Sequence, residues 1–356
     1  MSSIEIRYND VDRQRLTWLD IARGIGIILV VLGHSVTTVI RENSAAAMQI
    51  YNAVYFFHMP LLFFISGTAF ELKADKYRKT KVLSYIADKA KRLMIPYVLY
   101  SFLIYLCFFA ANLIPALAGK LEPIGYGKVS FLDWLYQMIT GENLYTQHLW
   151  YIYALFIISV IVFLTVKISG KFHRIIACVC AVCFIVILYY SNLLPGGFLW
   201  KTVYSAIWFM LGATVGINRE MKDPLKIIAI LAVPAMLYLR MKTKSLANGV
   251  FDAPVRILTI LAIIFGVIAL SQFLSRLRLK IFEWLGKNSF PIYLFHQPLF
   301  GSGLGVVLYG IFKLPVAFCI IVSFAASIVI PALIGIFIEK KDLKIGKIFI
   351  GKTSSR

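Results

Sequence analysis

Acidic residues are scarce in this sequence, and charged residues of either sign are few. Of 356 residues, 17 are Asp or Glu and 37 are Lys or Arg, so 15% are charged while 60% are hydrophobic. An ordinary soluble domain is only about 45–50% apolar, which excludes that class of protein. The net charge of +20 would indicate nucleic-acid binding in a soluble protein. Here the cations lie between long hydrophobic runs, so membrane lipid is an expected partner and nucleic acid is not.

Cysteine is also rare, and its five positions lie within hydrophobic runs, which predicts no disulfide framework. Cys178, Cys180 and Cys183 are spaced like metal ligands, but helical residues two apart point about 200° apart. We therefore expect buried thiols, no metal and no bound cofactor. We also expect no cleavable signal peptide, because no small-x-small cleavage site follows the run at 25–32, and we interpret this run as a retained first span.

Hydrophobic runs close to the ~20 residues that a spanning helix needs recur along the whole chain. They predict an all-α, polytopic membrane helix bundle of about ten transmembrane helices, forming a single domain over 1–356 with its core at 18–338. We expect a multi-pass protein of the cytoplasmic membrane. The ten runs fall at 18–40, 50–71, 93–111, 148–167, 175–191, 200–217, 226–239, 255–274, 289–310 and 316–338.

The distribution of Lys and Arg sets the orientation of these spans. With the N-terminus inside, 27 of these residues fall on the cytoplasmic side and 8 outside, which the positive-inside rule favours; both termini are then cytoplasmic. The most basic loop, 71–92, suits an amphipathic surface helix on anionic lipid or a phosphate-rich cytosolic ligand. The longest external segment, 112–147, suits a lid or an acceptor platform.

The first span, TWLDIARGIGIILVVLGHS, carries Arg23 near its start and His34 near its end. Their separation of eleven residues is three helical turns plus about 20°, so both point from one face, roughly 16 Å apart along the axis. Such side chains are costly in a membrane unless they face protein or a water-filled cavity. A guanidinium matches phosphate geometry, which suits a cytosolic ligand at Arg23. An ion pair with Asp20, three residues earlier, is the structural alternative.

Four of the five histidines fall between mid-membrane and the outer surface under this topology. A neutral imidazole takes protons near neutral pH and suits general-base work on a hydroxyl, although each histidine alone is as readily a structural hydrogen-bonder. Glu142, six residues before His148, is the candidate carboxylate that orients an imidazole; a solvated loop charge is the alternative. The four histidines are His34, His58, His148 and His296.

Ser66 and Gly67 form a small pair in the second span. Small residues permit close helix approach, and packing is the favoured interpretation. Ser66 is nevertheless kept as a candidate substrate-binding residue, together with Asp20, His58 and His296.

At these residues the chain resembles the membrane-bound acyltransferase 3 family. Four blocks carry the resemblance in the family's order: WLDIARGIGIILVVLGHS, FFHMPLLFFISG, HLWYIYALF and EWLGKNSFPIYLFHQPLF. It implies ten core helices, a cytosolic acyl-CoA donor and O-acylation of a glycan or lipid-linked sugar, and we expect the donor to be acetyl-CoA. His34 and Arg23 correspond to the family's essential histidine and arginine. The first block is most similar to the fucose 4-O-acetylase-related branch, which modifies sugars on bacterial glycans.

These features predict an integral membrane O-acyltransferase, with His34 as base and Arg23, Glu142 and His148 as further catalytic candidates. Its expected partners are the acyl-CoA donor, the sugar acceptor and lipid; a homo-oligomer stays open. Two other classes compete with it. A transporter or exporter of a small anionic or acylated metabolite also uses intramembrane charges, and its helices are often interrupted. A structural subunit of a glycan export complex is the third class, and it needs no Arg23–His34 pair.

Overall fold

The computed structural model describes four stretches of the chain and five isolated positions, and this part contains helices and no strand. Eight of its helices are long and apolar enough to cross a membrane, and a ninth candidate span is a helix pair bent by 58°. The predicted all-α polytopic bundle is thereby confirmed. The predicted span at 175–191 lies mostly outside the described residues, as do Cys178 and Cys180. The described residues are 3–169, 172, 175, 176, 179, 183, 197–215, 221–244 and 252–352.

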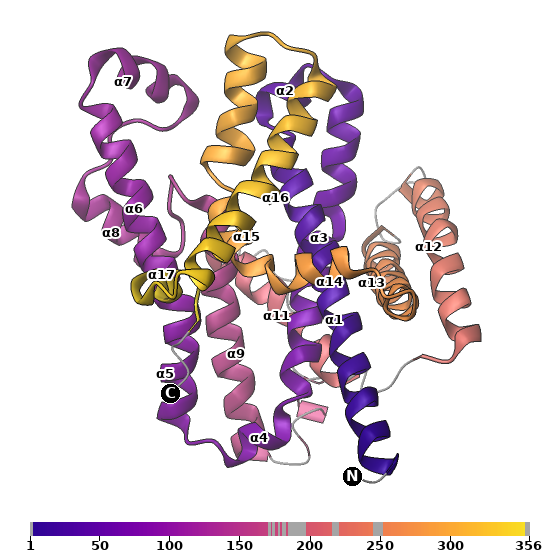
Figure 1. Cartoon of the computed structure of the whole chain (residues 1–356). Helices are drawn as coiled ribbons and strands as arrows, with labels where there is room; N and C mark the ends of the chain where they lie inside the picture. The colour runs from indigo at the N-terminus through magenta and orange to yellow at the C-terminus, as the bar shows by residue number, and fades with distance from the viewer. Residues whose placement is uncertain are drawn as a thin grey trace.

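Within each described stretch the helices follow one another through short connections, and Figure 1 draws both chain ends in the lower half with α2 and α7 at the top. In chain order they are α1 (Ser3–Ser35), α2 (Thr38–Glu42), α3 (Ala45–Glu71), α4 (Ala74–Lys79), α5 (Val82–Lys89), η1 (Ala90–Met94), α6 (Ile95–Asn112), α7 (Pro115–Leu121), η2 (Glu122–Ile124), α8 (Phe131–Thr140), η3 (Gln147–Leu149), α9 (Trp150–Ser169), α11 (Gly197–Val215), α12 (Asp223–Lys244), α13 (Asp252–Arg276), α14 (Lys280–Lys287), α15 (Ser289–Phe295), η5 (Leu299–Gly303), η6 (Val306–Ile311), α16 (Val316–Lys340) and α17 (Lys344–Phe349).

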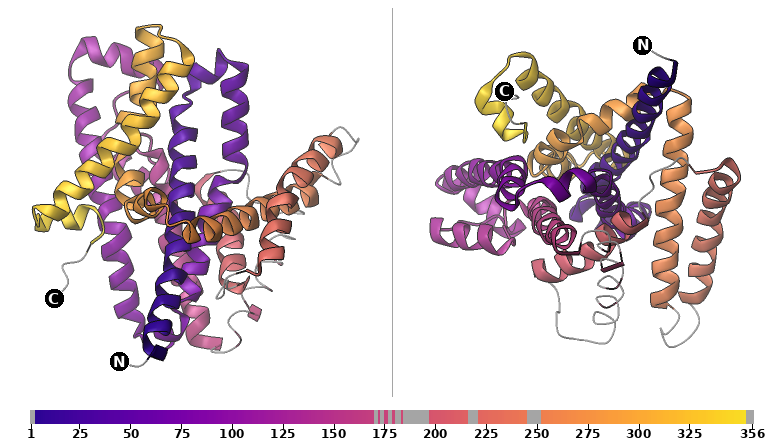
Figure 2. Two further views of the ribbon diagram at one scale, coloured as in Figure 1. Left: turned by 45° about the vertical axis from the view of Figure 1, so that its right-hand side comes forward. Right: turned by 90° about the horizontal axis from the view of Figure 1, so that it is seen from below.

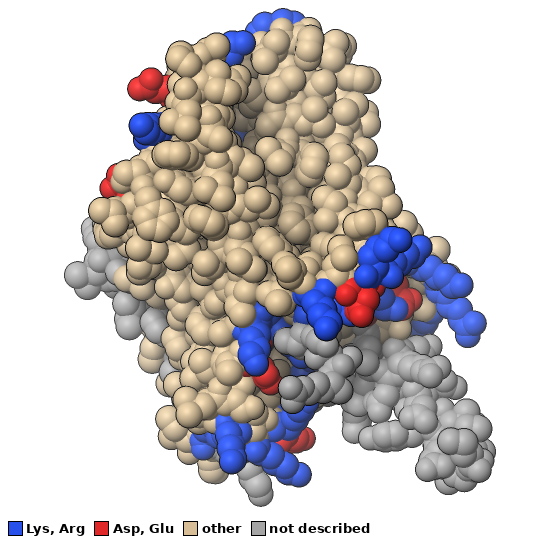
Figure 3. Space-filling view, turned by 60° about the vertical axis from the view of Figure 1, so that its left-hand side comes forward, with Lys and Arg blue, Asp and Glu red and all other residues tan. Residues whose placement is uncertain are grey.

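Charged side chains lie mainly toward one end of the molecule. In Figure 3 most of the visible Lys and Arg occupy the lower half, and a broad band without charge lies above them. We call the lower end, with the stretches 71–92 and 275–287, the basic side. The uncharged band is what a lipid-facing surface requires.

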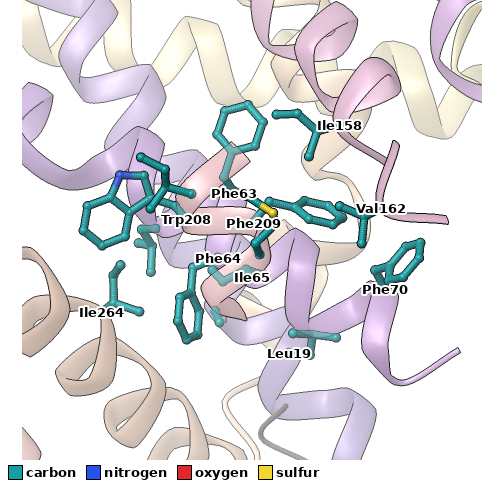
Figure 4. Packing of buried hydrophobic residues seen from close by; sticks show 14 of the residues in the cluster. Leu19, Phe63, Phe64, Ile65, Phe70, Ile158, Val162, Trp208, Phe209 and Ile264 are labelled. Carbon is teal, nitrogen blue, oxygen red and sulfur yellow. The ribbon is translucent and has the colours of Figure 1, made fainter. Parts of the chain in front are cut away.

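The main hydrophobic core lies where α3 packs against α11, with α1, α9 and α13 around them. Figure 4 shows its large side chains interleaved, among them Phe63, Phe64, Trp208 and Phe209. A side chain at Gly67 would place its Cβ 1.9 Å from the Phe209 carbonyl oxygen. The helices therefore approach this closely only because residue 67 lacks a side chain, as the small pair in the second span predicted.

The amphipathic helix α14 is held against the first span in the same way. A Cβ at Gly286 would lie 1.8 Å from the backbone oxygen of Asp20, and one at Gly24 would lie 2.3 Å from that of Phe282. Two glycines facing the partner helix's backbone let α14 lie directly beside the turn that carries Arg23. This contact fixes the position of Arg23 on the basic side.

The sequence of the basic stretch 71–92 suits a separate surface helix, but in the structure its second half is part of a longer span. α5, η1 and α6 run on as one span from Val82 to Asn112. The reason is Tyr85, which is buried and stacks on Phe163 of α9 with ring centroids 3.9 Å apart. This aromatic anchor ties the basic stretch to the bundle, so some of its cations line the interior.

The longest segment on the opposite side, 112–147, packs on α6 rather than standing free. Trp134 Nε1 donates to Ser101 Oγ (3.1 Å), Asn143 Nδ2 donates to the same oxygen (2.9 Å), and Tyr97 Oη donates to the Met138 carbonyl (2.7 Å). By contrast, α12 packs on α13 at the edge of the molecule, as Figures 1 and 2 show.

Candidate active site

His34 lies in the last turn of α1, close to α3. The chain reverses after it because Thr37 begins α2: its Oγ1 accepts a hydrogen bond from the Ile40 amide (3.4 Å), a typical N-cap. The short α2 leads into α3, which runs back alongside α1. In the resulting contact, the Nδ1 atom of His34 lies 3.3 Å from the hydroxyl oxygen of Tyr55 on α3.

Three histidines from three separate elements form a row. The ring centroids of His34 and His296 are 5.2 Å apart, and those of His296 and His148 are also 5.2 Å apart. We call these three residues the histidine row. His58 lies beside it, with its ring 4.8 Å from that of Tyr55. The four histidines that the sequence placed at similar depth therefore gather in one region of the fold.

His296 occupies the break between α15 and η5, where the ninth candidate span bends. Its Nδ1 lies 2.7 Å from the carbonyl oxygen of Tyr293. A carbonyl only accepts hydrogen bonds, so Nδ1 carries the proton and Nε2 presents a lone pair. That Nε2 is buried and has no hydrogen-bond partner in the described part of the chain. An unpaired buried acceptor lowers stability, and this nitrogen can accept a hydrogen bond from a ligand.

Backbone carbonyls also hold the other two histidines. His148 Nε2 lies 3.3 Å from the carbonyl oxygen of Leu294, and His58 Nδ1 lies 2.9 Å from that of Val54 one turn earlier in α3. Each ring therefore donates from one nitrogen and keeps the other as an acceptor. The bond of His58 stays within its own helix, whereas that of His148 joins η3 to α15.

A cavity of about 260 Å³ lies on the basic side between α1, α3, α9 and α15. Its wall combines cations, hydroxyl groups and apolar side chains; we call it the basic cavity. The polar lining residues are Arg23, Ser66, Lys73, Tyr77, Lys89, Tyr151, Ser289 and Tyr293.

The cations of the basic cavity outnumber the acids near them. Arg23 Nη1 pairs with Asp20 Oδ1 at 2.9 Å, the ion pair expected from their spacing. No ion pair of Lys73 or Lys89 is found among the described residues. Burial, together with the nearby positive charges of Arg23 and Arg92, holds the pKa of Lys73 below its ordinary value. Such crowding of like charges favours a polyanionic ligand.

Arg23 also lines a second, wider cavity of about 630 Å³ on the basic side. That cavity contains Lys287 and Lys352 together with Asp20. The guanidinium therefore stands at the boundary between the two cavities, where it can reach a ligand that extends from one into the other.

Two of the hydroxyl groups that line the basic cavity, those of Ser66 and Tyr151, lie next to each other. Ser66 Oγ donates to the carbonyl of Leu62 (2.8 Å) and lies 3.2 Å from Tyr151 Oη. The Ser66 proton is committed to its own helix, so Ser66 is a polar lining residue rather than an activated nucleophile. Gly67, not Ser66, makes the close contact with α11.

Tyr293 connects the basic cavity with the histidine row. Its side chain lines the cavity, its ring centroid lies 5.7 Å from that of His296 and 5.8 Å from that of His148, and its hydroxyl donates to the backbone carbonyl of His148. A ligand in the cavity is thus separated from the row by one side chain.

Glu142, the candidate carboxylate partner of His148, lies elsewhere. Its Oε1 accepts a hydrogen bond from the Phe198 amide (2.9 Å) at the start of α11. No hydrogen bond or ion pair joins it to His148 in the described part of the chain. A carboxylate at a helix N-terminus is stabilising there, and its role in orienting His148 stays a prediction.

Three residues near the site were not foreseen from the sequence. Tyr55 is missing from the sequence-based candidates, although Tyr51, Tyr55 and His58 follow an i, i+4, i+7 spacing on one helix face. Lys89 was counted only as a loop charge, and Tyr293 only as part of a hydrophobic run. Nothing local distinguishes these two, because their partners come from other spans.

Comparison with known proteins identifies the family to which this chain belongs. The sequence model of the acyltransferase domain of the acyltransferase 3 family matches residues 16–335. The nodulation protein NolL of Sinorhizobium fredii (strain NBRC 101917 / NGR234) is 38% identical over 87 residues. That match covers 24% of this chain and 23% of NolL, so the chain spans about a quarter of this relative's length. No solved structure matches.

The family match covers most of the chain and includes the whole histidine row and every residue of the basic cavity. This chain therefore carries the acyltransferase domain of the acyltransferase 3 family and belongs to that family.

Proposed function

We propose that this acyltransferase moves an acetyl group from cytosolic acetyl-CoA to a hydroxyl of a cell-surface or lipid-linked glycan sugar. In this proposal the protein lies in the cytoplasmic membrane, and its basic side faces the cytosol in line with the positive-inside rule. Acetyl-CoA acts as co-substrate, and no bound cofactor is required.

One observation carries this proposal. Tyr293 is at once a wall residue of the basic cavity and a neighbour of His148 and His296. A donor whose phosphates remain near the cations can therefore extend its thioester toward the histidine row. An acceptor that reaches His34 at the end of α1 meets that thioester from the opposite side.

The proposed binding of the acetyl-CoA donor depends on positively charged side chains. Coenzyme A carries several phosphate groups, and guanidinium and ammonium groups bind phosphate well. Arg23, Lys73 and Lys89 line one cavity, and Asp20 keeps the Arg23 fork oriented through their 2.9 Å contact. Ser66 and Tyr151 are among the hydroxyl groups that line the same cavity and are available to the donor.

The chemical step assigned to the row is general-base catalysis. Nε2 of His34 takes the proton of the sugar hydroxyl as its oxygen attacks the thioester carbonyl. The C–O bond of the ester forms, the C–S bond of the thioester breaks, and the proton passes to the coenzyme A thiolate. His58, His148 and His296 orient the reactants, and each has one ring nitrogen left as an acceptor.

The acceptor class is supported by the sequence alone. The first block of the chain resembles the fucose 4-O-acetylase-related branch, whose members modify sugars on bacterial glycans. A sugar hydroxyl is also the group that a neutral histidine base is suited to activate.

The experiment that tests the function is glycan O-acetylation in cells. A deletion strain is complemented with the wild-type gene or with His34→Ala, and protein level and membrane insertion are checked in both. We expect alkali-labile acetyl esters to disappear from the glycan with His34→Ala. Their persistence at the wild-type level contradicts the role of His34. Unchanged acetylation in the deletion strain itself contradicts the proposed function.

A further inference from the structure

We propose that Tyr55 is a positioning residue for His34. In this role its hydroxyl oxygen accepts a hydrogen bond from His34 Nδ1–H, which leaves Nε2 of the same ring free to receive the proton of the acceptor hydroxyl. The inference rests on the proposed function and adds to it the group that holds the base.

His34 differs from the other three histidines in the partner that orients its ring. His58, His148 and His296 are each bonded to a backbone carbonyl. In the described part of the chain, the hydrogen bond found for His34 goes instead to a side-chain hydroxyl, Tyr55 Oη, at 3.3 Å from Nδ1. A catalytic imidazole commonly has its second nitrogen held by an acceptor that fixes the tautomer, and Tyr55 occupies that place here.

The ring of Tyr55 is immobilised although 36% of the residue is exposed. Tyr51 stacks on one face with ring centroids 4.0 Å apart, and the edge of His58 packs against the ring at 4.8 Å. The Arg41 guanidinium lies over Tyr51, 4.3 Å from its centroid. Aromatic and cation–π contacts of this kind restrict the ring to one orientation, so its hydroxyl is aimed at His34.

The residue before His34 provides an independent observation. A Cβ at Gly33 would lie 2.9 Å from Cε2 of Tyr55 and 3.2 Å from Cγ1 of Val54. Tyr55 therefore rests on the bare backbone of α1, immediately beside the base. Any side chain at position 33 would push the phenol ring away from the imidazole.

In the chemical step, Nδ1 keeps its proton throughout and bonds to Tyr55 Oη. Nε2 gains the proton that leaves the acceptor hydroxyl, so the ring becomes a cation whose Nδ1–H bond to the phenol oxygen strengthens. The ring returns to neutral when that proton passes to the thiolate released from acetyl-CoA. Tyr55 neither gains nor loses a proton.

The first test compares Tyr55→Phe with Tyr97→Phe. The control removes another tyrosine hydroxyl that donates a 2.7 Å bond, to Met138, without contact with any histidine. The rate is measured as alkali-labile label transferred from radiolabelled acetyl-CoA to glycan in native membranes. We expect Tyr55→Phe to lower kcat about 10- to 100-fold, the range for a hydrogen bond to a charged group, with KM for acetyl-CoA changed less than about twofold. Tyr97→Phe should keep the wild-type kcat.

The second test displaces the ring and keeps its hydroxyl. Gly33→Ala crowds Tyr55, whereas Gly266→Ala crowds Val233 (2.6 Å) between α13 and α12, away from the site. We expect Gly33→Ala to lower kcat and Gly266→Ala to leave it unchanged. The double variant Gly33→Ala Tyr55→Phe should lose no more than Tyr55→Phe alone, because both changes remove one interaction.

Three outcomes overturn the inference while leaving the proposed function intact. They are a wild-type kcat in Tyr55→Phe, an equal loss in Tyr55→Phe and Tyr97→Phe, and a double variant whose losses multiply. Wild-type membranes that transfer no label to glycan overturn the proposed function, and the role of Tyr55 falls with it.

Discussion

The imidazole rings of His34 and His296 lie 5.2 Å apart, although one closes the first span and the other stands in the break before η5. The backbone carbonyl of Tyr293 holds Nδ1 of His296, so Nε2 is the nitrogen left for reaction. His296 is thereby the neighbour of His34 on the side of the basic cavity.

The contact between these two rings predicts the effect of replacing His296. His296→Gln removes the buried Nε2 acceptor, and we expect kcat to fall by about 100-fold, the lower range for proton-transfer groups. The measurement is label transfer from acetyl-CoA, with the unfolding temperature in detergent as the control for stability. A variant that is as stable and as active as wild type would show that His34 works without this neighbour.

Replacement of Arg23 tests whether this residue binds the acetyl-CoA donor. Arg23→Ala should raise KM for acetyl-CoA more than tenfold, and Arg23→Lys should lie between it and wild type because an ammonium cannot match the bidentate guanidinium. Arg78→Ala is the matched control, since Arg78 forms the same i,i+3 pair with Asp75 at 2.7 Å but does not line the basic cavity. An equal rise in both variants would mean that general surface charge, not Arg23, binds the donor.

The pKa of Lys73 predicts how donor binding depends on pH. Burial and the charges of Arg23 and Arg92 lower this pKa, so the positive charge is present at low pH and is lost, as pH rises, before that of an ordinary lysine. We expect kcat/KM for acetyl-CoA to fall on the alkaline side. Lys73→Arg should flatten that fall because guanidinium stays charged, whereas Lys76→Arg, outside the cavity wall, should leave the profile unchanged. The same alkaline fall in wild type and Lys73→Arg would exclude Lys73 as its origin.

The close packing of α3 on α11 predicts a stability effect. Gly67→Ala places a Cβ 1.9 Å from the Phe209 carbonyl oxygen, which forces the helices apart and should cost about 1–3 kcal/mol or more. Gly119→Ala meets no atom within 4 Å and serves as the control. Unfolding temperatures in detergent compare the two variants. Equal temperatures would mean that the helices tolerate the methyl group by a small shift.

Two variants of Glu142 distinguish a stabilising role at the start of α11 from a role in the reaction. Glu142→Ala removes the acceptor of the Phe198 amide and should cost about 1 kcal/mol of stability, as loss of a helix cap does. Glu142→Gln keeps an oxygen acceptor, and we expect near-normal stability and activity. A stable Glu142→Gln protein that has lost acyl transfer would instead assign the carboxylate to the reaction.

Several features of this protein could be predicted before its structure was known. Apolar run lengths predicted the spans, because a bilayer core demands about 20 apolar residues from every crossing. Helical periodicity predicted the shared face of Arg23 and His34. Asp20 pairs with Arg23 as their spacing predicted, and Gly67 makes the close helix contact that the small pair predicted. The four sequence blocks predicted membership of the acyltransferase 3 family, which the match over residues 16–335 confirms.

The residues that surround these groups follow from the packing of separate helices and could not be predicted. The histidine row joins α1, η3 and the end of α15, and Lys89 reaches the basic cavity because Tyr85 anchors its helix to α9. Tyr55 meets His34 because a bare glycine lets α3 approach α1. Such contacts depend on how separate helices pack side by side, and periodicity within one helix carries no information about its neighbour.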